Sequence, residues 1–76
     1  MDDVREKLGR CFAVTFPKLD PSRYSAADVQ NVPEWDSIAQ LTLLTVIGEE
    51  FNMEINVEDF EGATSFEALA QKLQVR

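Results

Sequence analysis

The chain has 76 residues, of which 45% are hydrophobic and 28% charged, and its formal net charge is −7. This length predicts one domain, residues 1–76, with a thin core and little room for a deep active site. The single cysteine, Cys11, excludes an internal disulfide framework, and no apolar run approaches the roughly 20 residues of a membrane-spanning helix.

The negative charge is concentrated in the second part of the chain. Residues 1–33 hold five acidic and five basic residues, whereas residues 34–76 hold nine acidic and two basic ones. We expect this surface to repel nucleic acid and anionic membranes and to attract basic patches on other proteins. An acidic surface that serves solubility alone is the alternative. A chain this acidic is also expected to be a monomer.

The N-terminal sequence MDDVREKLGR has neither the basic region nor the apolar region of a secretory signal. We therefore expect a cytoplasmic protein.

Apolar periodicity predicts a first amphipathic helix over residues 2–16, which Pro17 ends. Cys11 falls on its apolar stripe and is expected to be a small core residue. Residues 17–36 contain all three prolines and predict a long loop with one short turn around residues 25–29. Loops of this length in small domains are often functional.

A second helix is predicted over residues 37–51, with Asp36 as its N-cap. Its expected core face consists of Leu43, Leu44, Ile47 and Phe51. A flanking stripe comprises Ser37, Ile38, Leu41, Thr45 and Gly48. Asn52 follows the helix and tolerates the left-handed conformation of a C-cap.

The remaining sequence predicts two further helices. Asn56 is placed to cap a short turn over residues 57–60, which Gly62 ends. Thr64 and Glu67 have the spacing of a capping box that opens a last helix. The expected fold is therefore an all-α bundle of three main helices and one short helix.

The sequence contains few of the residues and spacings that catalytic and metal-binding sites require. The chain has no histidine, so Ser-His and Cys-His nucleophile pairs cannot form. Its three glycines are scattered rather than gathered in a phosphate loop, and the acidic residues lack the spacing of a calcium loop. We expect neither an enzyme nor a metal site.

Ser37 is the remaining candidate for chemistry. A serine in the first turn of a helix is common and needs no function. This serine, however, follows a long loop and opens the most apolar helix of the chain. A phosphate ester on its hydroxyl would lie near free backbone N–H groups and the positive end of the helix dipole. The position suits a serine that carries a phosphodiester.

The sequence DSIAQLTLLTVIGEEF, residues 36–51, resembles the signature of the acyl carrier protein family, in which Asp-Ser-Leu opens the second helix. FNMEI after that helix is similar to the family's Phe-Gly-x-x-Ile, with Asn52 in place of glycine. FEGATSFEALAQKL resembles its short third helix, turn and fourth helix. The likeness covers nearly the whole chain.

The resemblance implies that Ser37 bears a covalent 4'-phosphopantetheine arm, whose thiol holds acyl or aminoacyl groups as thioesters. A phosphopantetheinyl transferase would attach the arm, and Asp36 would guide its recognition. Ile38 and Leu41 occupy positions at which the family presents apolar contacts to partner enzymes. Trp35 lies beside the arm and belongs either to the same docking surface or to the packing of the loop on the bundle.

The chain departs from fatty-acid-synthesis carriers at Ala39, Thr42 and Gly48, where that group usually has acidic residues. This favours a specialised carrier for polyketide, nonribosomal-peptide or modified fatty-acid biosynthesis. Its partners would be an acyl- or aminoacyl-loading ligase and downstream transferases or synthases. The alternative is an acidic helical interaction module without a prosthetic group.

Overall fold

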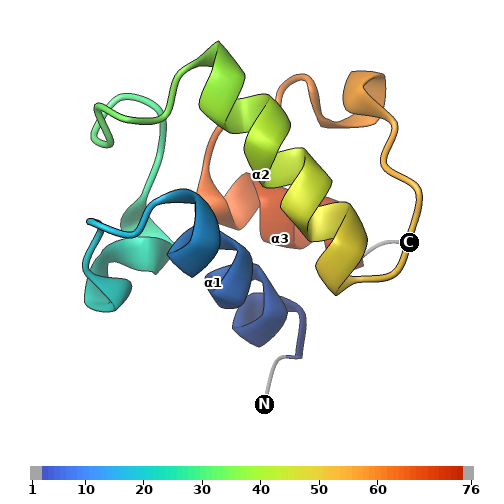
Figure 1. Cartoon of the computed structure of the whole chain (residues 1–76), viewed down its shortest axis with the longest axis horizontal. Coiled ribbons are helices and arrows are strands. Elements are labelled where there is room, and N and C mark those ends of the chain that lie inside the picture. Colours follow the sequence, from blue (N-terminus) through green and yellow to red (C-terminus); the bar gives the residue numbers. More distant parts are fainter. Residues whose placement is uncertain (1–2, 75–76) are drawn as a thin grey trace.

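The computed structural model describes residues 3–74 and contains five helical segments joined by loops (Figure 1). They are α1 (Asp3–Thr15), the 3-10 helix η1 (Pro21–Ala26), α2 (Ser37–Glu50), the 3-10 helix η2 (Val57–Phe60) and α3 (Phe66–Gln74). Residue 2, with which the predicted first helix begins, lies outside the described range. The predicted all-α bundle is confirmed, and none of the described helices is both long and apolar enough to cross a membrane.

The core forms where α1, α2 and α3 bury their apolar stripes against one another. Leu8, Cys11 and Phe12 of α1 are fully buried, as the periodicity predicts. Leu43, Leu44 and Ile47 of α2 are buried, while Phe51 is half-buried at the end of that helix. Phe66, Leu69, Ala70 and Leu73 form the buried face of α3. Burial of such side chains is the main favourable contribution to folding.

Five aromatic rings organise one end of this core around Phe12. The centroid of its ring lies 5.1 Å from that of Phe66, 5.4 Å from Trp35, 5.5 Å from Phe16 and 5.6 Å from Tyr24. The contacts with Trp35 and Phe66 are edge-to-face, an arrangement that suits the ring quadrupoles. The cluster joins α1 and α3 to the connection between α1 and α2.

The helical turn in that connection begins earlier than predicted. The sequence places it around residues 25–29, whereas η1 spans Pro21–Ala26. Asp20 explains the difference, because its carboxylate accepts hydrogen bonds from the Ser22 backbone N–H and hydroxyl, both at 3.0 Å. These bonds also hold the pKa of Asp20 below its usual value. Pro21 at the first helical position strengthens this start.

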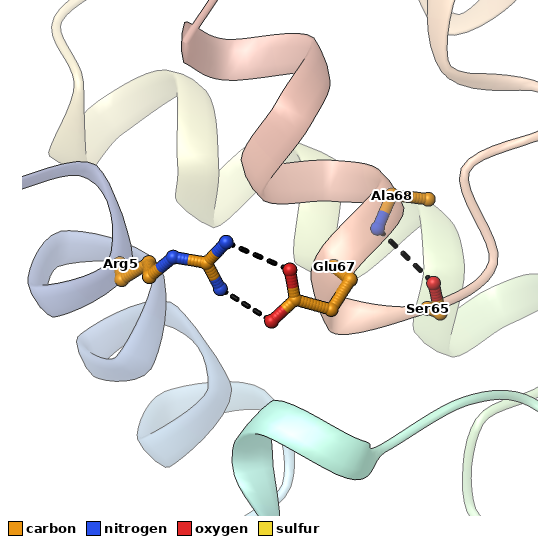
Figure 2. Close-up of polar contacts among 4 residues, drawn as sticks. All are labelled: Arg5, Ser65, Glu67 and Ala68. Carbon is orange, nitrogen blue, oxygen red and sulfur yellow. Dashed lines mark hydrogen bonds and ion pairs between the residues drawn. The ribbon is translucent and has the colours of Figure 1, made fainter. Parts of the chain in front are cut away.

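Two further caps agree with the sequence and one does not. Asn52 ends α2 with a φ of 52°, and the side chain of Asn56 accepts the Glu58 N–H at the start of η2, both as predicted. The predicted Thr64–Glu67 capping box is wrong. Ser65 caps α3, with its hydroxyl accepting the Ala68 N–H at 3.1 Å (Figure 2).

Glu67 is engaged elsewhere, which explains why the box does not form. Its carboxylate forms a bidentate ion pair with the guanidinium of Arg5 on α1, with 2.7 Å between Nη2 and Oε1 (Figure 2). A second ion pair joins Arg10 of α1 to Glu50 at the end of α2, at 3.0 Å. The basic residues Arg5 and Arg10 of α1 therefore face acidic residues of the neighbouring helices.

Candidate functional site

The start of α2 is built by Asp36. The backbone of Asp36 is extended, with φ −110° and ψ −169°, and its carboxylate Oδ1 accepts the Ala39 N–H at 2.8 Å. Its carbonyl oxygen accepts the Gln40 N–H at 2.8 Å. This is the N-cap that the sequence predicts, and it makes Ser37 the first residue of the helix. The other carboxylate oxygen, Oδ2, has no hydrogen-bond partner among residues 3–74.

Ser37 is exposed, and its hydroxyl has no hydrogen-bond partner within the described chain. The backbone N–H groups of Ser37 and Ile38 have no acceptor earlier in the helix, since the first turn of a helix leaves its donors unpaired. The Ala39 N–H, by contrast, is already bonded to Asp36. The start of α2 therefore leaves two backbone donors open, on Ser37 and Ile38, and one occupied, on Ala39.

Ser37 lies at the edge of a hollow of about 310 Å³. The walls come from the loop before α2, the first turn of α2 and the turn before α3. The residues that line the hollow are Val29, Trp35, Asp36, Ser37, Gln40, Glu61 and Thr64. The lining therefore combines the two carboxylates of Asp36 and Glu61 with polar and apolar side chains.

Gln40 holds three segments together behind this hollow. The indole Nε1 of Trp35 donates to Gln40 Oε1 at 2.6 Å, and Gln40 Nε2 donates to the carbonyl of Ala63 at 3.3 Å. Two backbone bonds fasten the same region, from Phe66 N to Ala27 O and from Val29 N to Thr64 O. The loop that leads to Ser37 is therefore tied both to α2 and to the start of α3.

The position of Trp35 corrects one part of the predicted docking surface. Only 4% of this residue is exposed, and its ring packs against Phe12 and Phe16. Packing of the loop on the bundle is the role that the structure shows, and Trp35 presents almost no surface to a partner. Burial of the Trp35 ring is favourable here because its indole N–H donates a hydrogen bond to Gln40 and is not left unpaired.

Ile38 and Leu41, the other two residues of the predicted docking surface, lie on the outside of α2. Ile38 is 75% exposed and Leu41 is 53% exposed. Leu41 follows Ser37 by four residues and Ile38 by three, so it lies one helical turn from both and is their neighbour on the helix surface. Ile38 and Leu41 are apolar side chains placed where a partner that approached Ser37 would meet them.

Sequence reasoning missed the residues that reach Ser37 from distant segments. Gln40 is a polar residue in the predicted second helix, but nothing in the sequence indicates that its partner is the backbone carbonyl of Ala63. Glu61 and Thr64 join the hollow only because the turn before α3 folds back against α2. Among residues 3–74, no group of three His, Cys, Asp or Glu side chains is placed to hold a metal ion.

Comparisons with protein-family models, with curated proteins and with solved structures give no match for this chain. The residues of the site themselves define its chemistry. They offer an exposed hydroxyl at a helix start, a capping carboxylate with one unused oxygen, and adjacent exposed aliphatic side chains.

Proposed function

We propose that this chain is a carrier protein whose prosthetic group, 4'-phosphopantetheine, is attached to Ser37. The single observation that carries the proposal is the exposed Ser37 hydroxyl at the first position of α2, directly after the Asp36 cap. The resemblance of residues 36–51 to the acyl carrier signature supports it. When bound, the group supplies a thiol that carries acyl or aminoacyl groups as thioesters.

The residues around Ser37 fit this group. The residue is exposed to solvent, and the hollow beside it offers polar and apolar walls to the neutral part of the arm beyond the phosphate, which the carboxylates of Asp36 and Glu61 would repel. The N–H groups of Ser37 and Ile38 and the positive end of α2 favour a phosphate ester there. The chain itself provides no base for Ser37, so the transferase must take the hydroxyl proton.

Asp36 serves two purposes in this proposal. Oδ1 caps α2 and fixes the orientation of its first turn, while Oδ2 stays available to the transferase. Ile38 and Leu41 are the apolar contacts for partner enzymes, which comprise a loading ligase and downstream transferases or synthases. The absence of charged residues between Ser37 and Gly48 favours a specialised biosynthetic pathway over housekeeping fatty-acid synthesis.

The test is intact-mass measurement after incubation with coenzyme A, magnesium and a broad-specificity phosphopantetheinyl transferase. The wild-type chain should gain the mass of one phosphopantetheine, and Ser37→Ala should gain none. Ser25→Ala, which removes another exposed hydroxyl, is the matched control and should be modified like the wild type. Asp36→Asn keeps a capping side chain but removes the charge, so it should fold normally and be modified more slowly.

A folded wild-type chain that several transferases leave unmodified would contradict the proposal. That result would favour the alternative, an acidic helical interaction module without a prosthetic group.

A further inference from the structure

Gln40 is the residue that links the start of α2 to its surroundings. Its backbone N–H donates to the Asp36 carbonyl at 2.8 Å. Its side-chain oxygen accepts the indole N–H of Trp35 at 2.6 Å, and its side-chain nitrogen donates to the Ala63 carbonyl at 3.3 Å. Among the residues that line the hollow beside Ser37, Gln40 alone has a side chain bonded both to the loop before α2 and to the turn before α3.

No other hydrogen bond within residues 3–74 joins the first turn of α2 to the turn of residues 61–64. In Figure 1, the green start of α2 lies beside the orange segment that leads to α3. The backbone bonds that fasten the preceding loop to the start of α3 do not reach α2. The side chain of Gln40 therefore sets the separation between the wall of the hollow that holds Ser37 and the opposite wall, which this turn forms.

The start of α2 depends on this link because it has few contacts with the core. No residue of α2 before Leu43 is buried, so hydrophobic packing does little to hold the turn that presents Ser37. Trp35 and Ala63, to which the side chain of Gln40 is bonded, are only 4% and 1% exposed. Helix ends with few buried contacts open at a low cost in free energy. Gln40 thus joins a weakly held turn to two points of the core.

We infer that Gln40 is a positioning residue for the attachment of phosphopantetheine to Ser37. Its link keeps the first turn of α2 helical and at a fixed separation from the turn before α3, so a transferase meets Ser37 in one orientation. Without the link, only a fraction of the molecules has this conformation at any moment, and the apparent affinity of the transferase falls by that fraction. The inference rests on the proposed function, and it gives Gln40 a role beyond pairing the indole N–H of Trp35.

Two altered proteins separate positioning from the pairing of a buried polar group. Gln40→Met keeps the length of the side chain and loses both of its hydrogen bonds. The second protein combines this substitution with the benzothiophene analogue of Trp35, which has the shape of tryptophan without the N–H. Because no indole N–H is left unpaired, its stability should recover part of the loss that Gln40→Met causes alone. The bond to Ala63 is absent from both proteins.

Steady-state kinetics with a broad-specificity phosphopantetheinyl transferase, at saturating coenzyme A and magnesium, give the first readout. We expect KM for the chain to rise roughly three- to tenfold in both Gln40 proteins, with kcat within about twofold of the wild-type value. This pattern follows because the transferase binds only the conformation that the link maintains. Gln71→Met, on the exposed face of α3, is the matched control and should leave both constants unchanged.

Amide hydrogen exchange of the unmodified chain gives a second readout that needs no transferase. The N–H groups of residues 39 and 40 both donate to Asp36, so their exchange reports on the first turn of α2. In both Gln40 proteins, this exchange should be roughly tenfold faster than in the wild type. The N–H of Ile47, in the buried part of α2, follows global stability, so in the second protein its exchange should return towards the wild-type rate.

A wild-type KM in the second protein would overturn the inference, because Gln40 would then serve only to pair the indole N–H of Trp35. Wild-type exchange rates at residues 39 and 40 would overturn it as well. A wild-type chain that is modified, with both Gln40 proteins sharing its KM, contradicts this inference alone. A wild-type chain that no transferase modifies contradicts the proposed function, and the exchange rates then still decide whether Gln40 holds the first turn of α2.

Discussion

The indole N–H of Trp35 donates a 2.6 Å hydrogen bond to the side-chain carbonyl of Gln40, five residues further along the chain. Gln40 continues the link to the Ala63 carbonyl through its own amide. The two bonds let a large aromatic residue be buried directly before the candidate serine without leaving its polar atom unpaired. They also connect the loop, α2 and the turn before α3 at the point where Ser37 is presented.

The first prediction tests this link. Gln40→Ala leaves the Trp35 N–H without its acceptor in a site that is 4% exposed, so it should lower the free energy of unfolding by about 1–2 kcal/mol. Urea denaturation followed by tryptophan fluorescence measures the change. Gln71→Ala is the matched control on the exposed face of α3 and should change stability by less than about 0.5 kcal/mol. Equal effects of the two substitutions would rule out a structural role for the link.

The second prediction compares two helical glycines. Gly9→Ala in α1 places its Cβ 3.6 Å from Tyr24 Cδ2, an ordinary contact, so better helix propensity should raise the free energy of unfolding by about 0.5–1 kcal/mol. Gly48→Ala meets the Met53 carbonyl and Ile55 at 3.1 and 3.2 Å. The Met53 N–H is bonded to Gly48 O at 2.9 Å, which keeps that segment close.

We therefore expect Gly48→Ala to lose the benefit of alanine and to be less stable than Gly9→Ala by about 1 kcal/mol or more. Thermal denaturation of both variants provides the comparison. A Gly48→Ala variant that gains as much stability as Gly9→Ala would show that the segment of residues 53–57 moves away from the added methyl group without a loss of stability.

The third prediction concerns the cap of α3. Ser65→Ala removes the acceptor of the Ala68 N–H and should cost about 1 kcal/mol of stability. Thr64→Ala removes a hydroxyl of the same kind one residue earlier, from an exposed position outside the helix, and should have an effect below about 0.5 kcal/mol. If chemical denaturation showed a larger loss of stability for Thr64→Ala than for Ser65→Ala, the cap would be Thr64, as the sequence predicts.

The fourth prediction uses the buried thiol. Burial and the nearby Glu50 raise the pKa of Cys11 to about 12, so the folded chain keeps this thiol protonated at pH 8. A disulfide reagent at pH 8 should leave the native chain unmodified and should modify one thiol per chain in urea. Rapid reaction of the native chain would contradict the packing of α1.

The same pKa difference makes stability depend on pH with a definite sign. An unfolded cysteine has a pKa near 8.5, so above about pH 8.5 the unfolded chain loses a proton that the folded chain retains. Stability should therefore fall as the pH rises from about 8.5 towards 12. Cys11→Ala should be less stable at neutral pH, but it should lack the part of the pH dependence of stability that comes from this thiol.

The sequence was sufficient for the helices because their apolar residues repeat with helical spacing. Leu8 with Phe12, Leu43 with Ile47, and Leu69 with Leu73 each mark one buried face. Asp36, Asn52 and Asn56 were also predictable, since each acts on the backbone within three residues of itself.

One error was local, since the Asp20 cap that starts η1 at Pro21 was overlooked, but the other two involve partners that are distant in the chain. Thr64 and Ser65 are equally suited to cap α3 by local rules, but Arg5 holds the Glu67 side chain that a capping box needs. The burial of Trp35 depends on Phe12 and on Gln40, and the second bond of Gln40 goes to Ala63, a residue with no distinctive side chain. Such pairings follow from tertiary packing, which a local pattern does not contain.

The ion pairs of α1 have a consequence for how the molecule moves. Arg5 and Arg10 offset carboxylates on the side where α1 meets its neighbours, while Glu54 and Glu58 have no such offset. This separation gives the protein a permanent electric dipole, which experiences a torque in the field of a positively charged partner. The molecule would rotate during its approach and present the acidic segment that holds Glu54 and Glu58 before contact, so the fraction of productive collisions would increase at low ionic strength.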